Sequence, residues 1–240
     1  YHIPSLSRSS INFSVYTSQG YLVFVPDIFY KVGSPGEAAF NAILPGITSL
    51  IGKGFVDKKR IGLQGHSWGG YQVAYLITRT NLFKAAVAGA IVSNMISAYG
   101  GIRWKSGLSR MSQYERGQSR IGGSLWQYKT RFIENSPIFR ADRIKTPLLM
   151  LHNENDGAVP WEEGIQMFMA MRRLGKPVWL INYSDEEHNL TKYQNRKDWT
   201  QRMHQFFDHY LKDTPAPVWM KGVVPEFQKG KTLGSKPGLQ

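Results

Sequence analysis

The chain has 240 residues, 42% of them hydrophobic and 20% charged, which is the composition of a globular protein long enough to form one sizeable core. It contains no cysteine, which excludes a disulfide framework and a thiolate metal site, and no apolar run approaches the roughly eighteen residues of a membrane span. The formal net charge is +13, with local density in residues 103–120, but no nucleic-acid-binding module accompanies it. We therefore expect a solvated basic surface, or the footprint of an acidic partner, and no nucleic-acid recognition.

The first half of the chain begins with a predicted strand and a predicted helix. Residues 20–27 (GYLVFVPD) form a short apolar, β-branched run that ends at a proline and an aspartate, which predicts a buried strand. Apolar residues then recur at the spacing of an amphipathic helix, namely Phe40, Ile43, Leu44, Ile47 and Ile51. Pro45 lies inside this pattern and is expected to kink or split the helix.

Strands and helices continue to alternate to the end of the chain. Further strands are predicted at 60–65, 85–93, 147–153 and 178–183, and helices at 71–79, 162–175 and about 199–211. This alternation predicts an α/β fold with a mostly parallel sheet and helices on both faces. The long segment 94–145 is expected to be an irregular lid or pocket wall, and the tail from Thr214 to run irregularly over the surface.

One serine lies in a glycine-rich turn between a predicted strand and a predicted helix. Gly65-His66-Ser67-Trp68-Gly69 matches G-x-S-x-G, and Gly70 follows directly. In a nucleophile elbow the residues around the serine are small because strand and helix approach closely there, while the hydroxyl projects from the turn. The context favours Ser67 as a nucleophile over a glycine-rich packing turn.

A serine hydroxyl needs a base, and the base needs an orienting carboxylate. Asp156 and His188 each follow a predicted strand, in the chain order Ser, acid, His that this elbow accompanies, so the three side chains could converge at one sheet edge. Glu154 is the alternative acid. The less favoured ionisable residues are given structural or solvated roles: His66, His152, His204 and His209 are expected to pack or to hydrogen-bond, and Asp185, Glu186 and Glu187 to be solvated.

With these residues assembled, the chain resembles the catalytic domain of the prolyl oligopeptidase family of serine peptidases, particularly its dipeptidyl-peptidase-like and acylaminoacyl-peptidase-like branches. The likeness runs from about Gly20 to Leu211 and is carried by GFVDKKRIGLQGHSWGGY, by RMHQFFDHYL and by the Asp156–His188 spacing with RRLGKPV between them. It implies the α/β-hydrolase fold, with Ser67 as nucleophile, Asp156 as acid and His188 as base. It also implies that the backbone N–H of Trp68 is an oxyanion donor, and it implies neither a metal nor an organic cofactor.

The chain departs from the family pattern beside the acid and at its beginning. Dipeptidyl-peptidase relatives commonly carry an asparagine two residues after the acid, where it holds a substrate carbonyl; this chain has Ala158. The wall of the pocket for the residue before the scissile bond is expected from 94–125, with Tyr99, Trp104 and Tyr114 as candidates. Residues 1–240 are interpreted as one catalytic domain that lacks its N-terminal strands, which a companion chain or segment would supply together with a β-propeller.

Three functions are carried forward from this interpretation. The first is a serine peptidase that cleaves short peptides through an acyl-enzyme. The second is a carboxylester hydrolase with the same triad, because fold and triad do not determine the substrate. The third is a non-catalytic subunit or binding module. The resemblance is compatible with a periplasmic or other exported location.

Overall fold

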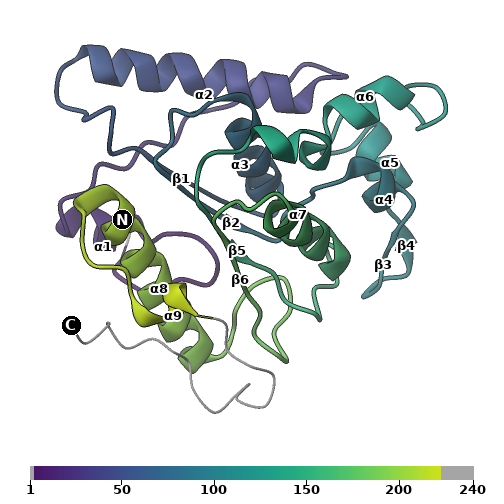
Figure 1. Ribbon diagram of the computed structural model, residues 1–240. Helices are drawn as coiled ribbons and strands as arrows, with labels where there is room; N and C mark the ends of the chain where they lie inside the picture. The colour runs from purple at the N-terminus through teal and green to yellow at the C-terminus, as the bar shows by residue number, and fades with distance from the viewer. Residues whose placement is uncertain (1–2, 223–240) are drawn as a thin grey trace.

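The computed structural model describes residues 3–222, which form a parallel sheet between two layers of helices (Figure 1). The sheet has the order β1-β2-β5-β6, and every neighbouring pair of strands is parallel. Its strands are β1 (Gly62–His66), β2 (Ala85–Gly89), β5 (Leu148–Leu151) and β6 (Val178–Ile181). The predicted α/β fold is confirmed, and these strands correspond to the runs predicted at 60–65, 85–93, 147–153 and 178–183.

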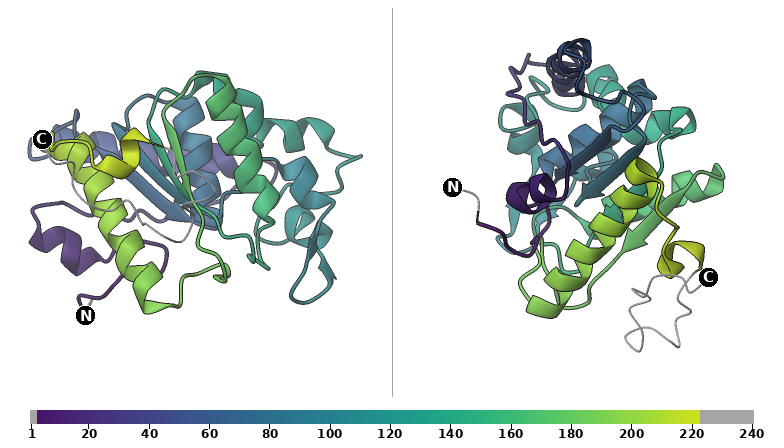
Figure 2. Two further views of the ribbon diagram at one scale, coloured as in Figure 1. Left: turned by 60° about the horizontal axis from the view of Figure 1, so that its bottom comes forward. Right: turned by 90° about the vertical axis from the view of Figure 1, so that its left-hand side faces the viewer.

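Alternate residues of β2 enter the two cores of the molecule because successive side chains of a strand point to opposite faces. Ala86 and Ala88 pack with α2 (Pro35–Gly52), α3 (Trp68–Arg79) and α7 (Trp161–Arg173). Ala85 and Val87 pack with side chains of α1 (Phe13–Ser18), α8 (Tyr193–Lys212) and α9 (Val218–Lys221). The two helical layers are visible on opposite sides of the sheet (Figure 2). The small side chains of β2 let both layers approach closely.

Helix α2 continues through Pro45 from Pro35 to Gly52, so the expected kink or split is wrong. A proline in a helix leaves the carbonyl four residues earlier without its N–H donor. That carbonyl belongs to Asn41, and both Asn41 and Pro45 lie on the exposed side of the helix. Water can therefore satisfy the carbonyl, and the buried side of α2, with Ile43 and Ile47, keeps the helix on the core.

The predicted strand at 20–27 is also wrong, because this segment has no regular secondary structure and belongs to no sheet. Tyr21 and Val23 pack against the core, whereas Leu22 and Val25 are 68% and 67% exposed. The side chains alternate as in a strand only from Tyr21 to Phe24, because Val25 is exposed directly after the exposed Phe24. Among the described residues, β1 pairs with β2 alone, and no strand pairs with 20–27.

The segment between β2 and β5 is more regular than predicted. It forms α4 (Met95–Tyr99), a hairpin of β3 (Ile102–Arg103) and β4 (Leu108–Ser109), α5 (Met111–Glu115), α6 (Lys129–Glu134) and the 3₁₀ helix η1 (Pro137–Arg143). These elements gather at one side of the sheet (Figure 1). They share a third core of aromatic and aliphatic side chains with α3, including Tyr71, Tyr75, Tyr99, Tyr114 and Phe132. The segment is thus a packed wall.

The segment after Thr214 is partly ordered against the core, contrary to the expected surface course. Helix α9 buries Trp219, which is 6% exposed and whose indole N–H donates to Gln205 Oε1 at 2.7 Å. The Arg202 guanidinium lies over the same ring, 5.3 Å from its centroid. The rest of the predicted tail, residues 223–240, lies outside the described residues.

Candidate active site

Ser67 lies between the end of β1 and the start of α3, in the backbone conformation of a strained turn. Its φ is 61° and its ψ is −119°, a region that non-glycine residues rarely adopt. The Ser67 N–H donates to the Gly89 carbonyl at 2.8 Å, which ties the turn to the neighbouring strand. The strand–turn–helix context predicted for G-x-S-x-G is therefore present.

Two of the three glycines around Ser67 are required by close backbone contacts. A Cβ on Gly65 would lie 2.3 Å from the Gly69 carbonyl oxygen, and one on Gly70 would lie 2.2 Å from the Gly89 carbonyl oxygen. Gly69 itself has nothing within 4 Å of an added Cβ. A small residue is therefore required at Gly65 and Gly70, whereas Gly69, the last residue of the G-x-S-x-G motif, makes no such close contact.

Asp156 and His188 come from loops that follow β5 and β6, and their side chains form a hydrogen bond. His188 Nδ1 lies 2.8 Å from Asp156 Oδ2. The other carboxylate oxygen, Oδ1, accepts the backbone N–H groups of Ala158 and Val159 at 2.8 and 2.9 Å. Burial alone would raise the pKa of Asp156, but the hydrogen bond and charge of His188 outweigh burial and lower the pKa. Because an ionised carboxylate only accepts, Nδ1 carries the proton and Nε2 is the basic nitrogen.

Ser67 and His188 line the same cavity, which has a volume of about 230 Å³. The remaining lining residues are Trp68, Val92, Arg103, Arg110, Gln113, Gln118, Ala158 and Val159. The cavity lies at the carboxyl ends of the parallel strands, the usual position for a site in such a sheet. A serine hydroxyl and a carboxylate-oriented imidazole that share one cavity have the parts needed for acyl transfer.

The loop that carries His188 is held by a buried carboxylate. Glu186 is only 1% exposed, so its expected solvation is wrong. It accepts hydrogen bonds from the backbone N–H groups of Thr191 and Lys192 and from the side chains of Thr191 and Asn195, all within 2.9 Å. These bonds join the loop to the start of α8, because the N–H groups there have no acceptor within the helix.

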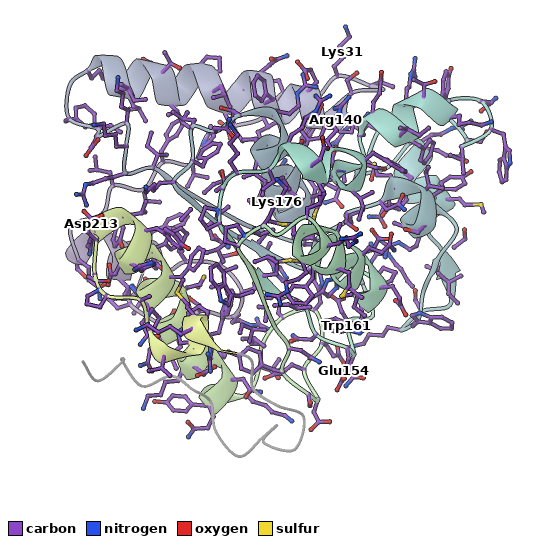
Figure 3. The ribbon with its side chains drawn as sticks, viewed as in Figure 1. Lys31, Arg140, Glu154, Trp161, Lys176 and Asp213 are labelled. Carbon is purple, nitrogen blue, oxygen red and sulfur yellow. The ribbon has the colours of Figure 1, made fainter. Side chains whose placement is uncertain are left out.

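The alternative acid, Glu154, is exposed and hydrogen-bonds with Asn182, whereas His188 bonds with Asp156. It lies on the outer side of the molecule, where Figure 3 labels it, and its carboxylate accepts a long 3.4 Å bond from Asn182. Asp185 and Glu187 are exposed, as predicted. The Glu187 carboxylate pairs with Lys105 at 2.7 Å, which connects the β3–β4 hairpin to the His188 loop.

Two further histidines pack behind the site, as the sequence predicts. The ring of His66 lies 4.7 Å from that of His188, and burial lowers the pKa of His66 to about 3. His152 is 1% exposed, and its Nε2 lies 3.1 Å from the Val159 carbonyl. Burial also lowers the pKa of His152. Both rings are therefore neutral near pH 7.

The three aromatic candidates for the pocket wall do not line the cavity that contains Ser67. Tyr99 and Tyr114 are 2% and 0% exposed and pack edge to face in the third core, with ring centroids 6.5 Å apart. Trp104 is 74% exposed, at the hairpin between β3 and β4. Their large apolar rings drew attention to them in the sequence, but packing within the wall decides which side chains face the cavity.

Sequence reasoning missed the polar side chains of the cavity and the support of Trp68. Arg103, Arg110, Gln113 and Gln118 all come from the basic segment 103–120, whose charge density was the one available signal. The Trp68 indole N–H donates to the Tyr30 hydroxyl at 2.9 Å. Tyr30 belongs to the irregular segment before α2, which no local pattern connects with the elbow.

The described residues offer no evident metal centre or membrane crossing. Within residues 3–222, His, Asp and Glu side chains do not gather in threes or more in a way that could hold a metal ion. In that same part of the chain, no helix combines the length and apolar character needed to cross a membrane.

The model of the prolyl oligopeptidase family matches residues 7–214 of this chain. The chain belongs to that family. The resemblance inferred from the elbow and from the Asp156–His188 spacing is thereby confirmed at the level of the prolyl oligopeptidase family.

Two curated relatives illustrate the relationship within the prolyl oligopeptidase family. An uncharacterized peptidase of Bacillus subtilis, YuxL, is 29% identical over 183 residues, which are 75% of this chain and 27% of the relative. Dipeptidyl-peptidase 5 of Porphyromonas endodontalis is 24% identical over 217 residues, 82% of this chain and 30% of the relative. The chain thus spans less than a third of the length of either protein.

A solved structure gives the same fold. The acylaminoacyl peptidase of Pyrococcus horikoshii matches with a TM-score of 0.66 and 24% identity, over 75% of this chain and 29% of that chain. At this identity the comparison establishes the fold, which is the α/β-hydrolase fold expected for a prolyl oligopeptidase family member.

Proposed function

We propose that the protein is a serine peptidase that hydrolyses short peptides through an acyl-enzyme, with Ser67 as nucleophile, His188 as general base and Asp156 as its orienting acid. The observation that carries this proposal is the cavity shared by Ser67 and His188, with the imidazole bonded to Asp156 at 2.8 Å. Membership of the prolyl oligopeptidase family supports a peptide as the substrate.

In the proposed reaction, Ser67 Oγ attacks the scissile carbonyl while His188 Nε2 takes its proton. The oxyanion that forms is stabilised by the Trp68 backbone N–H, which lies in the first turn of α3 and has no acceptor within the helix. The imidazolium then gives the proton to the leaving amine as the C–N bond breaks, which leaves the acyl-enzyme. Water, deprotonated by His188, attacks the ester, and as the C–O bond breaks the imidazolium returns the proton to Ser67 Oγ, which releases the carboxylic acid product.

We also propose that further polypeptide, from the same chain or from a companion chain, covers the outer edge of β1. Leu22, Val25 and Phe29 near this side are 68%, 67% and 88% exposed, and β1 has one strand partner among residues 3–222. The greater length of the relatives supports a continuous chain as the source. A natural protein that consists of one folded, monomeric species of 27.3 kDa would contradict this proposal.

The peptidase proposal is tested by a fluorophosphonate probe followed by peptide mapping, on the protein in its natural length. We expect the label on Ser67 and its loss in Ser67→Ala. Hydrolysis of peptide amides and of matched acyl esters should then both depend on Ser67, with measurable turnover of the amides. Turnover of esters alone would favour the carboxylester hydrolase, and absence of both label and turnover would favour the non-catalytic binding module.

A further inference from the structure

Arg110 is a buried cation on the wall of the cavity that contains Ser67. It lies between β4 and α5, is 1% exposed, and lines the cavity together with Ser67 and His188. Its guanidinium donates to the Tyr114 hydroxyl at 3.0 Å and to the Ala158 carbonyl. Its Nε atom is buried with no hydrogen-bond partner among the described residues. A guanidinium has five N–H donors, so the protein acceptors around Arg110 satisfy only part of its hydrogen-bonding capacity.

No carboxylate within residues 3–222 forms an ion pair with Arg110. The buried carboxylates around the cavity have other donors. Glu163 accepts from the backbone N–H groups of Ser93 and Asn94 and from the Ser97 hydroxyl, and Asp156 accepts from His188 and two backbone N–H groups. A buried charge without a counter-charge is costly, because water no longer solvates it. An anion that enters the cavity would supply the missing partner.

A second cation, Arg103, lines the same cavity. Its Nη2 donates to Gln113 Oε1 at 2.7 Å, and it too has no carboxylate partner in the described part of the chain. Gln113 and Gln118 add neutral polar groups to the wall, and none of the lining residues is acidic. Segment 103–120, which supplies these residues, contains five Lys and Arg residues and one Glu. The cavity beside the nucleophile is therefore cationic.

We propose that this cavity selects substrates with a carboxylate on the residue at the scissile bond or on its immediate neighbour, and that Arg110 and Arg103 bind that carboxylate. The inference rests on the proposed peptidase function. Guanidinium groups bind carboxylates through paired, charge-assisted hydrogen bonds, which are about twice as strong as neutral ones. The carboxylate comes either from an Asp or Glu side chain or from a free C-terminus.

Fluorogenic and unlabelled peptides distinguish these two sources. One pair of substrates carries Glu or Gln before the scissile bond, and a second pair carries them one residue further away. A third pair has Ala at both positions and ends, one residue after the scissile bond, in a free acid or an amide. We expect kcat/KM to favour the acidic member of at least one pair by about tenfold or more at low ionic strength, with the preference falling as salt is added. Equal rates within all three pairs would overturn the proposal.

Variants then connect the preference to the two arginines. Arg103→Gln and Arg110→Gln should each reduce the acidic preference, measured as the ratio of kcat/KM for the acidic and the neutral member of a pair, by about tenfold. Arg116→Gln is the matched control: Arg116 is exposed, lies in the same segment and lines the neighbouring open hollow without lining the Ser67 cavity. If Arg110→Gln slows acidic and neutral substrates equally, Arg110 holds a substrate carbonyl and the carboxylate proposal is wrong. If Arg110→Gln fails to fold, Arg103→Gln gives the same test, because Arg103 is only half-buried and lies on the β3–β4 hairpin.

A binding measurement separates this proposal from the peptidase proposal. In Ser67→Ala, calorimetry compares the affinity for the acidic and the neutral member of each peptide pair. A tenfold preference for the acid without turnover in the unmodified protein would support the carboxylate site and contradict the peptidase function. Turnover that depends on Ser67, with equal affinity for both members of every pair, would support the peptidase function and overturn the carboxylate site.

Discussion

The carboxylate of Asp156 holds His188 with one oxygen and its own loop with the other. Oδ2 lies 2.8 Å from His188 Nδ1, while Oδ1 accepts the backbone N–H groups of Ala158 and Val159. The same side chain thus fixes the orientation of the imidazole and the conformation of the cavity wall. These two tasks can be separated by a substitution that keeps Oδ1 as an acceptor.

We predict that Asp156→Asn folds normally and loses activity. The amide oxygen can still accept from Ala158 and Val159, but an amide N–H facing His188 imposes the tautomer whose Nε2 carries a proton. That nitrogen cannot act as a base, and kcat should fall by about 10³- to 10⁴-fold. Peptide turnover and thermal unfolding measure the two effects. Glu154→Gln, which changes an exposed carboxylate after the same strand, is the control and should keep the original rate.

We predict opposite effects for alanine at two adjacent glycines. Gly70→Ala places a Cβ 2.2 Å from the Gly89 carbonyl oxygen, which should lower the free energy of unfolding by about 1–3 kcal/mol or more. Gly69→Ala meets nothing within 4 Å, and it should leave the free energy of unfolding unchanged or raise it by up to about 1 kcal/mol. The midpoints of urea denaturation, compared at equal m-values, measure the change in the free energy of unfolding for both variants. Equal destabilisation by the two variants would contradict this account of the elbow.

We predict that the buried Glu186 positions His188 through the loop. Glu186→Ala removes the acceptor of several hydrogen bonds at the start of α8, so the free energy of unfolding should fall by about 1–3 kcal/mol and kcat should fall more than KM changes. The neighbouring Glu187→Gln removes only an exposed pair with Lys105, worth about 0–1 kcal/mol. If both variants lower kcat equally, the positioning role of Glu186 is excluded.

We predict that the protein loses stability in mild acid, in part because of His66. Its folded-state pKa of about 3 lies below the unfolded value near 6.5, so the unfolded chain binds the proton more readily. The free energy of unfolding should therefore fall as the pH is lowered from about 6.5 toward 3. His66→Gln should show a smaller loss between pH 7.5 and 5 in denaturant titrations. Ser67→Ala removes no group that titrates in this range and should keep the original slope.

Local sequence patterns were sufficient for the parts of the fold that depend on neighbouring residues. Strand β1, the elbow and helix α3 follow from an apolar run, a glycine-rich turn and a helical stripe that adjoin in the chain. Asp156 and His188 were predicted because parallel strands end at one edge of the sheet, so the residues that follow two such strands come together. Segment 20–27 has the same local pattern as a strand, but a strand also needs a hydrogen-bonded partner, and among residues 3–222 the segment pairs with none.

The alternation of elements, the family and the residues proposed for the chemistry follow from the amino-acid sequence, because they rest on short motifs and on the order of strands. The side chains that surround the reacting groups, in contrast, are set by how the chain packs in three dimensions. Tyr99 and Tyr114 have the large rings expected of a pocket wall, but they fill a core. Arg110 belongs to a residue type that is mostly exposed, but it is buried and lines the cavity with Ser67. Glu186 is likewise buried by contacts with α8. Such choices depend on packing between segments far apart in the chain, which no local pattern encodes.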